Sequence, residues 1–258
     1  MKRIGFLLII SLSILGGMAC SEESSSQSGP LEGDIKVLFI GNSLTYHYDT
    51  PGLFRELAQA AGKNVYVVDK CIGNASLTYH SMYSPTVEAI FEEQWDYVIL
   101  QGSDFNIISP NTYFDARPVE LLRDFILENN PATKIVFYMM WSMRDGYEDY
   151  SFDELTQHLR DGTKVIADRY DMQIAPVGWA WKRALSDYPD MNLYQWDLFH
   201  PNLAGAYLQA CVYYSTIFRE SSAGNTFIGE LNEGYTDYFQ EVASEIVLSE
   251  IEYWNLGE

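Results

Sequence analysis

Three polar side chains, far apart in the sequence, have the types needed for nucleophilic catalysis. Ser43 follows an apolar run that ends in Gly41-Asn42, whereas Asp197 and His200 lie close together near the other end of the chain. A serine hydroxyl becomes an effective nucleophile when a histidine takes its proton, and a carboxylate usually orients that histidine. Together the three side chains indicate acyl transfer through a covalent intermediate on Ser43.

The segment around Ser43 and the segment with Asp197 and His200 each have a simpler interpretation when taken alone. A serine in Gly-Asn-Ser is more often a turn or helix-cap residue than a nucleophile. Asp197 and His200 are also a possible metal-binding pair, so a metal-dependent phosphoesterase is an alternative, although no cluster of further ligands accompanies them. His47 and His80 lie near the first two predicted loops. Both could contact a substrate from there, but surface or capping histidines are more common, and we place neither in the site.

The elements that must position these residues alternate between short apolar strands and longer amphipathic helices. We predict strands over residues 35–40, 65–69, 97–100, 135–140 and 172–176. Helices are predicted over about 51–62, 85–94, 117–129, 153–168 and 180–187, with two more after Pro201-Asn202. This alternation is typical of a parallel sheet with helices on both faces. The fold class is therefore α/β, and its ligands should bind at the carboxyl ends of the strands.

Two segments resemble motifs of the SGNH hydrolases, also called GDSL esterases. The first, residues 37–45, reads Val-Leu-Phe-Ile-Gly-Asn-Ser-Leu-Thr, and the last, residues 197–202, reads Asp-Leu-Phe-His-Pro-Asn. Gly73 is similar to the glycine of the second motif, and the resemblance spans the domain. It extends to a branch of the superfamily found in exported bacterial proteins.

The resemblance implies a flavodoxin-like three-layer α/β/α sandwich with a five-stranded parallel sheet. It also implies ester hydrolysis that needs no metal and no other cofactor. By the same resemblance, Ser43 is the nucleophile, His200 the general base and later the acid, and Asp197 the group that orients the histidine.

The third motif departs from the family pattern. The family reads Gly-x-Asn-Asp there, with an asparagine that helps to bind the oxyanion, whereas this chain reads Leu-Gln-Gly-Ser-Asp over residues 100–104. An acid at Asp104 would repel an oxyanion, whereas the amide of Gln101 is equivalent to that of asparagine and one methylene longer. We therefore expect an oxyanion hole made by the backbone N–H groups of Ser43 and Gly73 and by Gln101.

The N-terminal residues are typical of a bacterial export signal. Lys2 and Arg3 precede a short apolar run, and Leu-Gly-Gly-Met-Ala-Cys over residues 15–20 resembles a lipobox. We expect residues 1–19 to be a lipoprotein signal peptide and Cys20 to be lipidated. Residues 20–33 would form a flexible Ser/Glu-rich tether, and residues 34–258 a single SGNH hydrolase domain. An ordinary secretory signal cut near Ala19 is the alternative.

The charge balance argues against nucleic acid as a partner. The chain has 16 Lys+Arg against 36 Asp+Glu, a formal net charge of −20, which phosphate backbones would repel. The expected location is the cell envelope, on the outer surface or periplasmic face of a bacterial membrane, held by the lipid anchor. Cys71 and Cys211 could pair in an oxidising compartment, but buried free thiols are at least as consistent with their apolar surroundings.

The predicted function is hydrolysis of carboxylic esters, with small molecules or glycans as substrates. Acylated glycans are favoured because aromatic side chains near predicted strand ends could stack on sugars, although core packing is the simpler interpretation of any single ring. These side chains are Trp141, Trp179, Trp181, Tyr194 and Trp196. The alternative from another class is a non-catalytic glycan-binding surface lipoprotein with the same fold, which the altered third motif favours.

Overall fold

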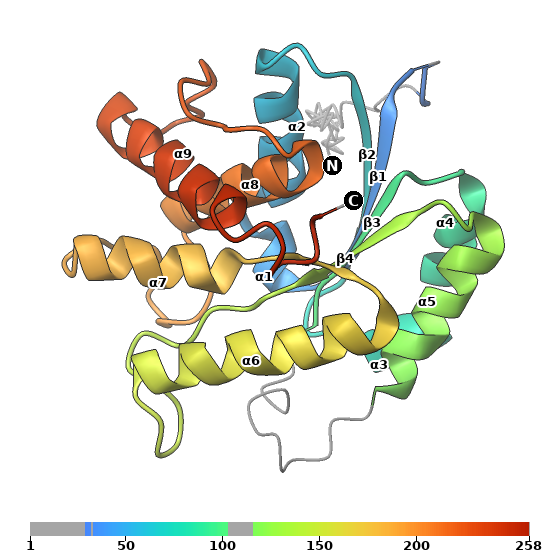
Figure 1. Ribbon diagram of the computed structural model, residues 1–258, viewed down its shortest axis with the longest axis horizontal. Coiled ribbons are helices and arrows are strands. Elements are labelled where there is room, and N and C mark those ends of the chain that lie inside the picture. The colour runs from blue at the N-terminus through green and yellow to red at the C-terminus, as the bar shows by residue number, and fades with distance from the viewer. Residues whose placement is uncertain (1–28, 32, 103–115, 258) are drawn as a thin grey trace, which may run out of the picture.

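The central sheet has five strands, all parallel, in the computed structural model, which describes residues 29–31, 33–102 and 116–257 (Figure 1). The strand order is β2-β1-β3-β4-β5. The strands are β1 (Ile35–Gly41), β2 (Val65–Cys71), β3 (Tyr97–Leu100), β4 (Lys134–Tyr138) and β5 (Gln173–Ala175). The predicted five-stranded parallel sheet and its α/β class are confirmed. Because β1 lies between β2 and β3, its carboxyl end is a topological switch point, where ligands bind in sheets of this kind.

The helices form a layer on each face of the sheet. In Figure 1, α2, α7, α8 and α9 pack together on one side, and α3, α4 and α5 pack together on the other. The long α6 contacts β4, β5 and α7. The helices are α1 (Ser43–Tyr46), α2 (Thr50–Ala60), α3 (Leu77–Met82), α4 (Ser84–Glu92), α5 (Arg117–Asn129), α6 (Phe152–Tyr170), α7 (Val177–Asp187), α8 (Leu203–Phe218) and α9 (Glu233–Leu248).

The core gives the site a rigid support. Residues 37–40 of β1 are almost fully buried, as expected for a strand covered on both faces. Helix α8 is buried from Gly205 to Ile217 because it lies between α2 and α9. A helix enclosed in this way is apolar around its whole circumference, and α8 begins directly after the segment that contains His200.

The predicted aromatic residues have very different environments. Trp141 and Trp181 are fully buried, and their rings stack with centroids 4.0 Å apart. The hydroxyl of Tyr194 donates to the backbone oxygen of Ser142 at 2.8 Å. These three rings belong to the core and are not available to sugars. Trp179 lies against the guanidinium of Arg160 at 4.2 Å, whereas Trp196 is 90% exposed.

The N-terminal predictions fall mostly outside the described residues. The signal peptide over residues 1–19, Cys20 and most of the tether lie there, as does Asp104 of the third motif. In the described ranges, no helix is both long enough and apolar enough to cross a membrane. Cys71 and Cys211 are separate free thiols.

Candidate active site

Ser43 occupies a tight turn at the carboxyl end of β1. Asn42 caps α1, because its side-chain oxygen accepts a hydrogen bond from the Leu44 backbone N–H at 3.0 Å. The Asn42 amide nitrogen donates to the backbone oxygen of Ala75 at 3.0 Å, which ties this turn to the loop after β2. Ser43 is therefore the first residue of α1 and is half-buried at the sheet edge.

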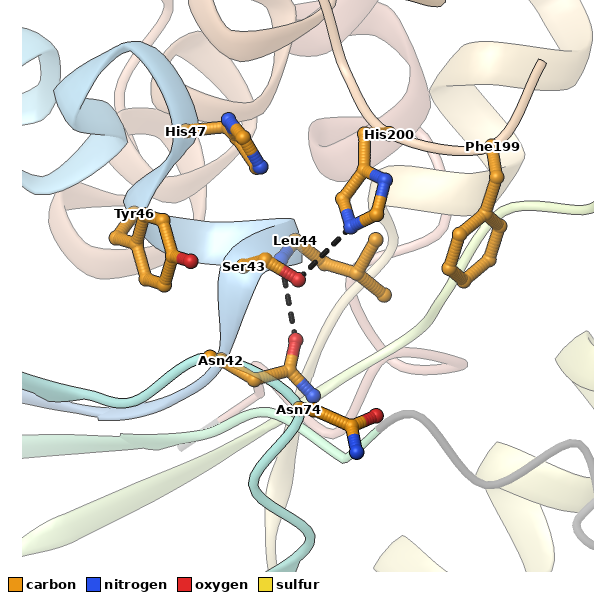
Figure 2. Close-up of a pocket in the computed structure, with 9 residues that line it drawn as sticks. Asn42, Ser43, Leu44, Tyr46, His47, Asn74, Phe199 and His200 are labelled. Atoms are coloured by element: carbon orange, nitrogen blue, oxygen red, sulfur yellow. Dashed lines mark hydrogen bonds between the residues drawn. The ribbon is translucent and has the colours of Figure 1, made fainter. Parts of the chain in front are cut away.

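The structure brings Ser43, His200 and Asp197 into one chain of hydrogen bonds. Ser43 Oγ lies 2.9 Å from His200 Nε2 (Figure 2), and His200 Nδ1 lies 2.5 Å from Asp197 Oδ2. Because an ionised carboxylate can only accept, Nδ1 carries the hydrogen and Nε2 is left to accept from the serine hydroxyl. This is the arrangement in which a histidine can remove a proton from serine.

A strained turn holds the aspartate. Asp197 Oδ1 accepts from the backbone N–H groups of Phe199 at 3.1 Å and His200 at 3.0 Å. Leu198 between them has φ of +57°, a conformation that costs a non-glycine residue free energy and clusters at functional sites. Burial would raise the pKa of Asp197, but the hydrogen bonds from His200 and the two backbone N–H groups outweigh it and lower that pKa. Asp197 is therefore charged at neutral pH.

A pocket of about 380 Å³ opens over the serine. It is lined by Asn42, Ser43, Leu44, Tyr46, His47, Gly73, Asn74, Phe199 and His200. Within the described residues, neither Ser43 nor Gly73 donates its backbone N–H to an acceptor. Both residues line the pocket, so their N–H groups are candidates for binding a ligand. The described residues hold no group of three or more His, Cys, Asp or Glu side chains that could bind a metal ion.

Comparisons with known proteins identify the fold. No protein-family model matches the chain, and no curated protein sequence does. A DUF4886 family protein from Bacteroides uniformis superposes with a TM-score of 0.71 at 19% identity, over 83% of this chain and 95% of that one. A putative SGNH hydrolase from Slackia heliotrinireducens superposes with a TM-score of 0.59 at 25% identity, over 70% and 98%. The chain has the SGNH hydrolase fold.

An esterase with the same fold gives a further reference. An acetylxylan esterase from Geobacillus stearothermophilus superposes with a TM-score of 0.53 at 19% identity, covering 70% of this chain and 93% of the esterase. At this identity the likeness concerns the fold alone. The expected flavodoxin-like three-layer sandwich of the SGNH hydrolases is therefore confirmed.

Gln101 does not take the position predicted for an oxyanion donor. It is 1% exposed and does not line the pocket. Its side-chain oxygen accepts from the Asn42 backbone N–H at 2.7 Å and from the Thr45 hydroxyl at 2.9 Å. Its amide nitrogen donates to the Gly102 oxygen at 3.0 Å. The amide is thus engaged behind the Ser43 turn, where it gives the buried Asn42 N–H an acceptor, and it is not directed into the pocket.

The close approach of Gln101 depends on a glycine. A Cβ atom on residue 41 would lie 2.6 Å from Gln101 Oε1, so Gly41 leaves the space that the glutamine fills. His80 also contacts this turn: it is fully buried, with Nε2 2.8 Å from the Gly41 oxygen and Nδ1 2.9 Å from Thr86 Oγ1. His80 lies outside the pocket, as predicted, but in the core and not at the surface. Burial lowers the pKa of His80.

Two pocket residues were not included in the predicted site. His47 lines the pocket, and its ring centroid is 4.8 Å from that of His200. Asn74 lines the opposite wall in Figure 2 and has φ of +58°, a conformation that asparagine tolerates better than most residues. Asn74 follows Gly73 of the second motif, and that adjacency was a usable signal. For His47 the signal was its position near the loop after the first strand, but the more common surface or capping role was preferred.

Proposed function

We propose that the protein hydrolyses carboxylic esters through an acyl-enzyme on Ser43. The observation that carries this proposal is the continuous hydrogen-bonded chain from Ser43 Oγ through His200 to Asp197, at the floor of an open pocket. The SGNH fold adds support because neighbours of this fold are described as hydrolases and esterases.

Acylation begins when Ser43 Oγ attacks the ester carbonyl carbon while His200 Nε2 takes the hydroxyl proton. Asp197 stabilises the imidazolium that forms and keeps its Nδ1–H directed at the carboxylate. The tetrahedral intermediate then collapses, the bond to the alcohol oxygen breaks, and His200 gives the proton to the leaving alcohol. Water repeats the sequence on the acyl-enzyme, releases the carboxylic acid and restores the serine.

The negative carbonyl oxygen of the intermediate needs preorganised donors. We assign this role to the backbone N–H groups of Ser43 and Gly73, which line the pocket without another acceptor among the described residues. The third donor is the side-chain amide of Asn74, in place of Gln101. In Figure 2, Asn74 lies below Ser43, on the side away from His200, where a carbonyl oxygen would be directed.

Acylated glycans are the substrate class that we favour. The exposed Trp196 directly precedes Asp197 in the sequence, and exposed rings of this kind can stack on sugars. A neighbour of the same fold is described as an acetylxylan esterase. Both observations support a glycan ester, and neither identifies the acyl group.

The test is a panel of chromogenic acyl esters and acetylated oligosaccharides, assayed with the wild-type protein and with Ser43→Ala. We expect turnover in the wild type, loss of turnover in Ser43→Ala, and no effect of a chelator. A wild-type protein that binds the oligosaccharides without turnover would support a glycan-binding function instead. Turnover that a chelator abolishes would favour a metal-dependent mechanism.

We also propose that the mature protein is held in the cell envelope by acylated Cys20. The support is the lipobox-like sequence over residues 15–20 and the polar stretch that follows it. Several acyl chains hold a protein firmly at a membrane, whereas one chain does so marginally. Cys20→Ser should therefore move the protein from the membrane fraction to the soluble fraction, or leave it unprocessed. Unchanged membrane fractionation of this variant would refute the anchor.

A further inference from the structure

His47 lies in the pocket, but the proposed chemistry assigns it no role. Its ring is half-buried and meets the ring of His200 edge to face, with centroids 4.8 Å apart. In Figure 2 the His47 ring extends over the pocket on the same side of Ser43 as His200, with its outer nitrogen directed toward the serine. A polar ring atom in this position can reach a bound ester.

A neighbouring glutamine fixes which His47 nitrogen carries the hydrogen. The amide nitrogen of Gln195 lies 2.9 Å from the Pro201 backbone oxygen and 3.2 Å from His47 Nδ1. A carbonyl oxygen can only accept, so the Gln195 atom between them is the nitrogen, and its second hydrogen is directed at Nδ1. His47 Nδ1 is therefore an acceptor, and in the neutral ring the hydrogen is on Nε2.

The surroundings of His47 favour the neutral ring. Burial lowers the pKa of His47, and the neighbouring His200 lowers it further, whereas Asp197 acts weakly in the opposite direction. A second positive charge beside His200 would also oppose the imidazolium that the reaction forms there. His47 thus presents an uncharged N–H donor to the pocket throughout the reaction.

The positions of the pocket residues indicate where the acyl half and the alcohol half of a bound ester would lie. Asn74 lies on one side of Ser43, and His200 and His47 lie on the other (Figure 2); Gly73, which precedes Asn74 in the chain, lines the same pocket. The carbonyl oxygen is directed at the Asn74 side, and the leaving oxygen must face His200 Nε2, which protonates it. The Nε2–H of His47 consequently lies beside the alcohol half of the substrate, next to the leaving oxygen.

We propose that His47 is a specificity residue that donates a hydrogen bond from Nε2 to a second oxygen of the alcohol, close to the ester oxygen. This inference rests on the proposed esterase function. Esters of polyhydroxy alcohols, such as glycerol or sugars, supply that oxygen. Esters of simple alkyl alcohols do not, and they leave a half-buried donor without a partner, which lowers their transition-state binding.

A matched pair of substrates tests the proposal. Glycerol 1-monoacetate and propyl acetate have the same acyl group and the same three-carbon chain, and they differ in the two hydroxyls. We compare the ratio of their kcat/KM values in the wild type, in His47→Phe and in a control, His158→Phe. The phenyl ring keeps the shape of residue 47 but has no donor. His158 packs against Tyr150 and is not part of the pocket lining.

The wild type should prefer the glycerol ester, and His47→Phe should reduce that preference by about tenfold, the usual size of one neutral hydrogen bond lost from a transition state. His158→Phe should retain the wild-type preference. Equal loss on both esters in His47→Phe, or an unchanged ratio, overturns the proposal while leaving the esterase function intact. A wild type that hydrolyses no ester at all, including p-nitrophenyl acetate, overturns the proposed function itself.

Nitrogen-15 NMR tests the tautomer without any turnover. In the wild type at neutral pH, the two His47 ring nitrogens should show the shifts of a neutral ring protonated on Nε2. Gln195→Leu removes the donor to Nδ1, so the two tautomers should mix and part of the glycerol ester preference should disappear. A wild-type His47 that carries its hydrogen on Nδ1 refutes the proposal.

Discussion

The two halves of the proposed catalytic site are supported in different ways. The Ser43 turn rests on Gln101 and His80, whose side chains are 1% and 0% exposed, so its position is determined by the core. Asp197 and His200 lie in a surface segment with the exposed Trp196 and Leu198. Hydrogen bonds within the segment shape it, and the buried Trp141 donates one more to the Phe199 backbone oxygen at 2.9 Å. Damage to the core should therefore displace the nucleophile, whereas surface changes should act on the base.

The largest expected effect on kcat comes from substituting Ser43 or His200 directly. Ser43→Ala and His200→Ala should each reduce kcat by at least about 10³-fold, and the double variant should be little worse than either, because members of a triad act as one unit. Steady-state kinetics on chromogenic esters measures this. Asp197→Ala should cost less, since a misoriented histidine keeps some basicity. Wild-type turnover in Ser43→Ala would refute the assignment.

A smaller effect on kcat is expected from substituting Asn74, which lies across the pocket from His200. Asn74→Ala should lower kcat by about 10²-fold with little change in KM, because an oxyanion donor acts in the transition state and not on the bound substrate. Asn74→Asp is the matched control and should be at least as impaired, since it places a negative charge beside a developing one. Near-normal kcat in both variants would remove Asn74 from the oxyanion hole.

Removing the Gln101 side chain should affect the free energy of unfolding more than the chemistry at Ser43. Gln101→Ala leaves the buried Asn42 N–H without an acceptor, which should reduce the free energy of unfolding by about 1–3 kcal/mol. Urea denaturation measures this change, and active-site titration corrects kcat for the folded fraction. Stability equal to that of the wild type, together with a heavily reduced kcat, would instead restore Gln101 as a direct oxyanion donor.

The sequence was sufficient to predict the sheet and to predict that His200 and Asp197 lie next to Ser43. Apolar runs located all five strands, because buried parallel strands have few polar residues. Helices α1 and α3 were missed, since helices of 4 and 6 residues are too short for a repeating apolar pattern. The interpretation of Gln101 failed for another reason. Its residue type suits an oxyanion, and the requirement of Asn42 N–H for an acceptor became visible once both atoms had positions.

Substitution of His80 should have the smallest effect, and this effect should appear in the pH dependence of the free energy of unfolding. Burial lowers its pKa in the folded protein below the ordinary 6.5, so the unfolded chain binds the proton more readily. Its stabilising contribution is fully present above that ordinary value and is lost as the pH falls below it. The decline in unfolding free energy from pH 7 to pH 5 should be shallower in His80→Gln than in the wild type. Parallel denaturation series would show this, and identical slopes would contradict it.

The distance along the chain between the two halves has a consequence for biosynthesis. Ser43 and His200 are 157 positions apart, and α8, which follows His200, is enclosed only when α2 and α9 are both in place. A growing polypeptide therefore carries a serine without its base for most of its synthesis. Contacts this remote in sequence form late in folding. Nascent chains that stop before α8 should contain the nucleophile turn and hydrolyse nothing, so the activity would first appear after the C-terminal helices have docked.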